Sequence, residues 1–298
     1  MIKRKKLLPS FMAGLILFAA ISPGIEAEGV KFGLKLSGGI GYFDLKDVND
    51  YIRGRAQFRK EDAVVMGYPA SGDFERLHYG LDAGVELLIF LHPRLAISLG
   101  SSYITGRAGK DGQGITVREP ALTIHSTNQS GIRAVPATLG ISYFIPLGRS
   151  LHLYATAGGS YYWVKWTNDL KDEWLGRGGE SESREANGHG IGVSGGFGFE
   201  FNLMPAVAFF LEGSGRYVKA ENFEAEEDYS IRDGSYSLAE HYSGKLYYLE
   251  YYWPYTNRWY PTQVVEREKP SGSYFRNVRE VSIDLSGFSI RAGLRIQF

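Results

Sequence analysis

The 298-residue sequence has no cysteine and no excess of charge of either sign, with 33 basic and 33 acidic residues. A chain without thiols suits passage through an oxidising envelope compartment. Nucleic-acid binding would call for a basic surplus on one face, and the charge balance gives no sign of one. The composition therefore favours an envelope protein and no nucleic-acid partner.

Enzyme signatures are also missing. The sequence contains no nucleophile elbow, no phosphate-binding glycine loop and no metal-ligand spacing among its six histidines. We therefore expect a protein that is not an enzyme, with no catalytic residues, no bound metal and no cofactor.

Long apolar runs are absent beyond the N-terminus. Basic residues 3–6 precede an apolar run over residues 7–21, and a break at Pro23 leads to a small residue, Ala27. This is the layout of a secretory signal peptide over residues 1–27, and the run is shorter than the ~20 residues of a retained membrane anchor. Cleavage would leave 29 basic and 32 acidic residues, a net charge of −3.

What the chain does have is apolar alternation with a period of two residues, which predicts strands. The alternating segments are 30–42, 79–91, 95–103, 135–145, 151–163, 190–201, 207–217 and 287–298. Their count is even, and each reaches the ~9–11 residues that a tilted strand needs to cross a bilayer. One face carries Leu, Ile, Val, Phe and Tyr, and the other is rich in Gly and Ser. Because small side chains suit a confined surface, we expect the large apolar face to meet lipid.

The connections between these segments alternate strictly in length. Short links at residues 92–94, 147–150 and 204–205 alternate with long ones at about 44–77, 107–130, 167–187 and 220–278. Outer-membrane barrels have tight periplasmic turns and long extracellular loops. The sequence thus predicts an all-β, transmembrane, antiparallel up-and-down β-barrel of eight strands over residues 28–298, with both chain termini of the barrel on the periplasmic side.

The closing segment, DLSGFSIRAGLRIQF, alternates apolar residues and ends on an aromatic, Phe298. It resembles the last strand of small Gram-negative outer-membrane proteins. The segments VPATLGISYFIPL and LYATAGGSYYW resemble adjacent strands of the OmpA- and OmpW-like β-barrel superfamily. The resemblance implies a bacterial outer-membrane location, contact with outer-membrane lipid, and recognition of Phe298 by the barrel-assembly machinery. It implies no particular activity, because such barrels host unrelated functions.

Eight charged residues fall on the inward face. They are Lys35, Asp82, Glu86, Glu200, Glu212, Arg216, Arg291 and Arg295. Unpaired charges inside a narrow barrel are costly, so we expect a network of salt bridges in which Glu212 meets Arg291 and Lys35 meets Glu86. Such a network could be a structural plug, line a polar conduit, or include a catalytic pair of carboxylates. The plug is favoured.

The first and last long links carry further features. Leu45, Val48, Ile52 and Ala56 have helical spacing, with Asp44 or Asp47 as a candidate cap, so a short helix over the barrel mouth competes with an irregular loop. The last link begins with clustered carboxylates, Glu221, Glu224, Glu226, Glu227 and Asp228. Without a ligand-loop spacing they favour a solvated acidic patch over a cation site.

Nine aromatic residues lie within residues 242–260. Eight of them form a candidate surface-binding set, namely Tyr247, Tyr248, Tyr251, Tyr252, Trp253, Tyr255, Trp259 and Tyr260. They could settle at a membrane interface, or recognise an extracellular glycan, lipid or protein ligand. A strand pair over about 241–265, turning near Pro254, would give ten strands, although Pro261 weakens its second half.

Two functions remain open from the sequence. The favoured one is a structural or surface-interaction barrel that is plugged by its salt bridges and makes contacts through extracellular loops. The alternative is a narrow porin-like channel or transporter for small or apolar solutes. A continuous layer of paired charges would favour the plug, and an apolar lining above that layer would favour transport.

Overall fold

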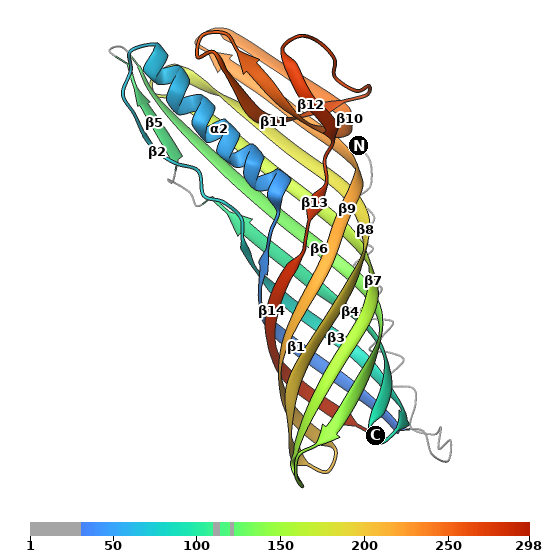
Figure 1. The fold of residues 1–298 in the computed structure, drawn as a ribbon. Coiled ribbons are helices and arrows are strands. Elements are labelled where there is room, and N and C mark those ends of the chain that lie inside the picture. Colours follow the sequence, from blue (N-terminus) through green and yellow to red (C-terminus); the bar gives the residue numbers. More distant parts are fainter. Residues whose placement is uncertain (1–30, 110–113, 120–121) are drawn as a thin grey trace.

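Eight antiparallel strands close into a ring in the computed structural model, which describes residues 31–109, 114–119 and 122–298 (Figure 1). In ring order they are β1 (Lys31–Phe43), β3 (Tyr79–His92), β4 (Leu95–Ala108), β6 (Thr123–Pro146), β7 (Leu151–Trp174), β8 (Gly178–Met204), β9 (Val207–Asp233) and β14 (Gly287–Gln297). The predicted eight-stranded up-and-down barrel is confirmed. The predicted signal peptide, residues 1–27, lies outside the described residues.

The ring closes where the first strand meets the last. β1 and β14 pair from Gly33 opposite Gln297 to Phe43 opposite Gly287. Beyond this ladder, the backbone amide of Phe298 donates to the carbonyl of Phe32 at 2.9 Å. The final aromatic residue is thus part of the seam, and its recognition by assembly machinery stays a prediction.

The outer wall of the ring is a belt of exposed apolar side chains. Its members include Leu36, Ile40, Leu81, Leu99, Leu139, Ile141, Ile191, Val193, Phe197, Phe199, Leu211, Phe288, Ile290 and Leu294. A soluble domain rarely exposes so large a continuous apolar surface. The predicted outward orientation of the apolar face is therefore confirmed, and the wall is that of a membrane-spanning barrel. Among the described residues, no helix is long and apolar enough to cross a membrane.

Above the ring, β6, β7, β8 and β9 continue as a curved sheet (Figure 1). The edges of this sheet carry β2 (Ala70–Gly72) and β5 (Gly114–Arg118) on one side, and β10 (Tyr236–Trp253), β11 (Arg258–Glu266) and β12 (Phe275–Glu280) on the other. The short β13 (Ile283–Asp284) pairs with β9 below them. We call this extension, together with the helix it holds, the upper lobe. It lies at the end of the barrel opposite the tight turns.

Much of the chain expected to form long loops is strand instead. Residues 167–174 and 178–187 continue β7 and β8 as one hairpin, and β9 runs on to Asp233. The inward side chains here include Asn168, Asp172, Glu182 and Arg184, so polar residues occupy both faces. An apolar-alternation pattern cannot reveal such strands, which explains the difference.

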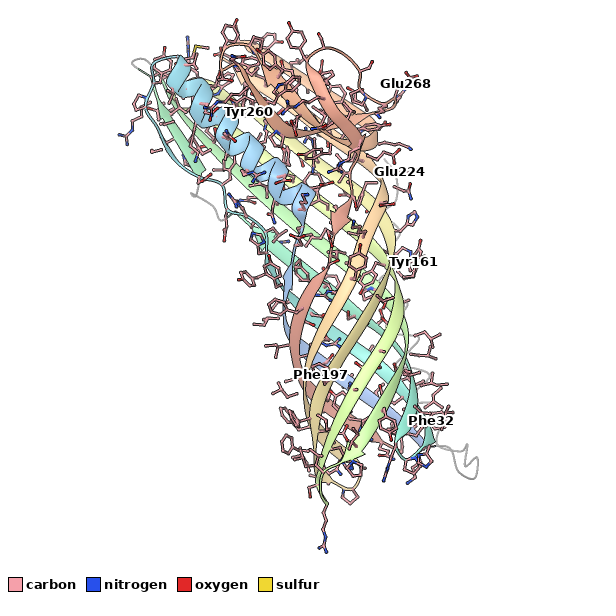
Figure 2. The ribbon with its side chains drawn as sticks, in the orientation of Figure 1. Phe32, Tyr161, Phe197, Glu224, Tyr260 and Glu268 are labelled. Carbon is pink, nitrogen blue, oxygen red and sulfur yellow. The ribbon has the colours of Figure 1, made fainter. Side chains whose placement is uncertain are left out.

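The helix α2 (Lys46–Val65) lies along the hollow of the upper lobe (Figures 1 and 2). It is longer than the short helix suggested by the sequence. Its N-cap is Leu45 in a left-handed conformation with φ 48°, and no side chain caps it. The proposed caps Asp44 and Asp47 are therefore wrong. The Asp47 carboxylate instead accepts two hydrogen bonds of 2.6 Å from the Arg279 guanidinium.

The aromatic segment does form a strand pair, β10 and β11, that turns over Pro254–Asn257. The pair belongs to the upper lobe and does not enter the ring, so the ten-stranded alternative is wrong. Pro261 is tolerated because β11 is an edge strand. The helix passes close to this edge: a Cβ at Gly54 would lie 2.0 Å from the Pro261 carbonyl oxygen.

Candidate functional site

The middle of the barrel is crossed by a layer of paired charges. Glu212 accepts a hydrogen bond of 3.0 Å from the Lys35 ammonium and another from the Arg291 guanidinium. The Tyr154 hydroxyl donates to the same carboxylate at 3.0 Å. Lys35 also lies 3.5 Å from Glu86. Four of the eight inward charges thus form one buried network around Glu212, on strands β1, β3, β9 and β14.

The other four inward charges form two separate pairs, one above and one below this layer. Arg216 donates to Asp82 at 3.1 Å on the upper side. Arg295 donates two hydrogen bonds of 2.6 and 2.9 Å to the Glu200 carboxylate on the side of the tight turns. The structure therefore places every charge of the predicted set inside the barrel, each facing a partner of opposite sign.

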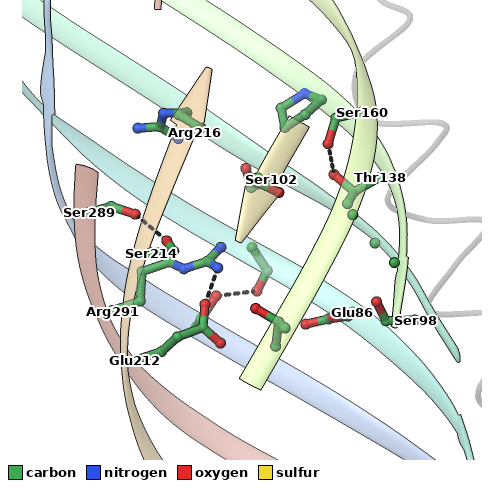
Figure 3. A pocket seen from close by; sticks show the side chains of 18 of the residues that line it. Glu86, Ser98, Ser102, Thr138, Ser160, Glu212, Ser214, Arg216, Ser289 and Arg291 are labelled. Atoms are coloured by element: carbon green, nitrogen blue, oxygen red, sulfur yellow. Dashed lines mark hydrogen bonds and ion pairs between the residues drawn. The ribbon is translucent and has the colours of Figure 1, made fainter. Parts of the chain in front are cut away.

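A cavity of about 100 Å³ lies between the Glu212 network and the Arg216–Asp82 pair (Figure 3). Small polar side chains and glycines make up most of its wall, and the charged residues of the two pairings complete it. Hydroxyl pairs bridge neighbouring strands around it, with Ser214 and Ser289 at 2.9 Å and Thr138 and Ser160 at 2.7 Å. The space can hold a few water molecules and excludes larger solutes.

The end of the barrel near the tight turns is closed by large inward side chains. The large ones are Leu88, Phe90, Phe144, Tyr154 and Phe210, and the small Ala96 packs among them. Their rings pack in sequence in tilted pairs, with centroids 5.5 Å apart from Phe90 to Phe144 and from Phe144 to Tyr154. The Lys35 ammonium lies 4.5 Å from the Phe210 ring centroid, so this aromatic floor is continuous with the charged layer.

The opposite end is closed by an apolar core that α2 completes. Helix residues Val48, Tyr51 and Ile52 are fully buried, and they belong to one cluster with wall residues such as Trp166 and Phe43. The cluster extends from the top of the ring into the upper lobe. The lumen is therefore interrupted three times: by the aromatic floor, by the charged layer and by the helix with its apolar core.

A second buried charge network fixes the polar side of α2 to the sheet. Tyr51 donates to Glu182 at 3.2 Å, and Arg55 lies 3.7 Å from the same carboxylate. On the sheet, Arg184 bridges Glu182 at 2.9 Å and Glu227 at 2.6 Å. The contacts tie the middle of the helix to β8 and β9 by charge as well as by packing.

One turn further along α2, the Arg59 guanidinium pairs closely with Asp172 of β7 and lies 3.9 Å from Glu180. Burial, reinforced by the neighbouring Arg55, lowers the pKa of Arg59 to about 10. The side chain still carries its charge at neutral pH, so the pair with Asp172 persists there. This contact extends the fixation of the helix to a third strand.

The ionisation of this network favours a closed lobe at neutral pH. Burial raises the pKa of Tyr51 to about 12, with Glu182 adding to the shift, so the hydroxyl remains a donor. Burial also opposes charge on Glu182, but Arg184 and Arg55 outweigh it and hold its pKa below the usual value. A carboxyl group whose pKa is lower in the folded than in the unfolded state stabilises the fold at pH values above its unfolded-state pKa. That stabilisation is lost as the pH falls through the folded-state pKa.

The aromatic segment mostly serves this same closure. Tyr247, Tyr248 and Tyr260 are buried, and Tyr248 belongs to the apolar core around the helix. The Trp253 indole donates to Asp62 of α2 at 2.8 Å, and the Tyr260 hydroxyl donates to Glu61 at 2.6 Å. The segment therefore clamps the second half of α2, and only part of it is accessible to a ligand.

Two partly accessible rings of the segment, Tyr252 and Trp259, form a small platform with Tyr274, which follows the segment in the chain. The Tyr252 centroid lies 5.1 Å from that of Trp259 and 6.4 Å from that of Tyr274. The Arg276 guanidinium covers Trp259 at 4.4 Å and donates to Glu250 at 2.6 Å. Of the remaining candidates, Tyr251 packs on Phe275 and Tyr255 is largely exposed at the turn. Partly exposed rings beside polar groups can stack on a flat ligand.

The acidic segment of β9 splits between the two faces of the sheet. Glu224, Glu226 and Asp228 are exposed, while Glu227 turns inward to Arg184. Among the residues that the structure describes, no group of three or more acidic or histidine side chains is arranged to hold a metal ion. Glu221 is exposed as well, so the alternation of β9 turns only Glu227 of the five predicted carboxylates away from solvent.

Two parts of the site escaped sequence reasoning. The first is the helix network, although Tyr51, Arg55 and Arg59 recur every four residues and so share one face of α2. The second is the aromatic floor, whose members alternate with outward residues and read as part of the polar face. The four-residue spacing on α2 could have revealed the helix network. The large residues at inward positions near the tight turns could have revealed the aromatic floor.

Comparison with known proteins gives structural neighbours only: no family model and no curated protein matches the chain. The outer membrane protein OprG from Pseudomonas aeruginosa aligns over 90% of this chain and 95% of its own, with 11% identity and a TM-score of 0.43. Neisserial surface protein A aligns over 91% and 100%, with 11% identity and 0.32. A major outer membrane protein from Thermus thermophilus aligns over 90% and 99%, with 12% identity and 0.36. The barrel assignment itself rests on the closed ring and the apolar belt of this chain.

Proposed function

We propose that the protein is a closed barrel of the outer membrane that acts through its upper lobe, which it holds on the cell surface as an anchored contact structure. The observation that carries this proposal is the position of α2. The helix fills the hollow above the ring and is fixed there by an apolar core and by the Tyr51–Glu182–Arg184 contacts. A channel would leave this space open to its solute.

The layer of paired charges, which favours a plug, and the apolar side chains above it, which would favour transport, are both present. Paired charges cross the barrel, and apolar side chains lie above them. The apolar side chains are packed against α2 and against one another, so they form a core and do not line a passage. This arrangement supports the plugged barrel over the transport alternative.

Planar-bilayer recording tests whether the barrel is closed. The refolded protein is expected to give no steady single-channel current, because the aromatic floor, the charged layer and the helix each block the lumen. An open porin in the same bilayer is the control for sensitivity, and a shift in gel mobility on boiling reports that the barrel is folded. Reproducible unitary currents from the folded protein would contradict the proposal.

Surface labelling tests whether the upper lobe faces the outside. The Ser243→Cys variant places a thiol on the exposed part of β10, and Ser150→Cys places one in an exposed tight turn. With a thiol reagent that does not cross membranes, we expect intact cells to be labelled at position 243 and protected at position 150, since tight turns face the periplasm. Breaking the outer membrane should expose both. Labelling of the turn and protection of the lobe in intact cells would reverse the topology.

A further inference from the structure

An apolar groove of about 640 Å³ lies on the outer wall of the barrel, across β1, β3, β4 and β6. Ile40, Leu81 and Tyr79 line it and leave 63%, 62% and 71% of their surface exposed. Tyr103 lines it as well. The groove belongs to the apolar belt, so its occupant comes from the membrane.

Two arginines line the groove beside these apolar residues. Arg133 lies directly opposite Thr105, and Arg107 lies two residues further along the same strand, so the two are diagonal neighbours. Their Cα atoms are therefore about 7–8 Å apart. Both are exposed, and neither forms an ion pair with any residue in the described ranges. Lys165, the other cross-strand neighbour of Arg133, is by contrast paired with Glu185.

The height of the groove assigns it to the outer leaflet. β4 enters the wall from the tight turn at Leu95 and ends at Ala108, so Arg107 lies at the end nearest the upper lobe. The β3–β4 register brings Tyr79 level with Arg107 and places Tyr103 two residues closer to the tight turn than Thr105. Tyrosine settles where hydrocarbon meets headgroups. The groove is thus at acyl-chain depth, and the arginines are at headgroup depth.

We propose that this groove binds a phosphate-bearing lipid of the outer leaflet, with an acyl chain along Ile40 and Leu81 and a headgroup phosphate between Arg107 and Arg133. Two adjacent guanidinium groups that have no carboxylate partner in the part of the chain the structure describes repel each other, and a shared phosphate removes that repulsion. Guanidinium also matches phosphate geometry with paired hydrogen bonds. The site is separate from the closed lumen, so it does not depend on the proposed function of the upper lobe.

Native mass spectrometry of the folded barrel in detergent tests the site with three probes: lipid A with its phosphates, the same lipid after enzymatic dephosphorylation, and phosphatidylcholine. The variant Arg107→Gln/Arg133→Gln, called the rim variant, removes both guanidinium groups from the edge of the groove. The matched control Arg149→Gln/Arg177→Gln removes two exposed arginines from turns at the two ends of the molecule. A third variant, Thr105→Trp, fills the groove and keeps both charges.

We expect the wild-type barrel and the control variant to retain one equivalent of lipid A. The rim variant should retain at least tenfold less, and Thr105→Trp should also lose retention. Equal retention of the phosphorylated and dephosphorylated lipids would overturn the phosphate contact. Equal retention by the rim and control variants would reduce the contact to ordinary annular lipid. Preserved gel shifts on boiling exclude misfolding as the cause of any loss.

Discussion

Replacing Glu212 with alanine is expected to lower the free energy of unfolding of the barrel by about 3–5 kcal/mol, because it leaves buried cations without their shared partner. Glu212 is 2% exposed and accepts hydrogen bonds from Lys35, Arg291 and Tyr154. Lys35 keeps Glu86 at 3.5 Å, but Arg291 loses its paired carboxylate. The measurement is equilibrium unfolding in detergent micelles by denaturant, followed by tryptophan fluorescence.

The matched control is Glu226→Ala, which removes a carboxylate from the exposed face of β9. Exposed carboxylates contribute little, so this variant should unfold within about 0.5 kcal/mol of wild type. Glu212→Gln should fall between the two, since it keeps an acceptor for the cations and loses the charge. If Glu212→Ala unfolds like Glu226→Ala, the charged layer is not a structural plug.

Replacing Trp166 with alanine is expected to cost the upper lobe about 3–5 kcal/mol, the range for removing a large aromatic side chain from a core. Trp166 is fully buried, donates to Ser130 at 3.0 Å, and meets the Tyr51 ring edge-on at 6.1 Å. Its loss should free α2 from the sheet while the ring below stays closed. Limited proteolysis should then cut within residues 46–65, and the barrel should keep its shift in gel mobility.

Trp163→Ala is the matched control on the same strand. Trp163 is 53% exposed on the outer wall and makes no contact with the helix core. We expect its α2 to resist protease as in the wild type. Equal protease sensitivity of the two variants, or loss of the ring in Trp166→Ala, would show that the lobe is not closed by its own core.

The fold was largely predictable because the membrane imposes it on the sequence. Lipid demands large apolar residues at alternate positions, and the narrow lumen demands small ones, as Phe197 and Phe199 beside Gly196 and Gly198 illustrate. The pairing of Lys35 with Glu86 could likewise be anticipated from strand depth, since both positions follow from counting residues from the tight turns. These features depend only on local alternation.

The upper lobe was not predictable in the same way. Its strands carry polar residues on both faces, since the side facing α2 holds Glu182 and Arg184 and the other side faces water. The polarity of each inward position depends on what the helix presents there, and that is a contact between distant segments. The same holds for the aromatic segment, where burial of Tyr248 and Tyr260 depends on the path of α2.

The central claim is that the lumen is closed at both ends, and thiol accessibility tests it most directly because the chain has no cysteine of its own. Ser98 lines the cavity and is 4% exposed, so Ser98→Cys places a thiol inside it. With a small cationic methanethiosulfonate, the folded Ser98→Cys barrel should remain unmodified while Ser243→Cys reacts within minutes. Both variants should react fully once the barrel is unfolded. Modification of the folded Ser98→Cys barrel at a rate similar to that of Ser243→Cys would show an open path to the cavity and contradict the closed barrel.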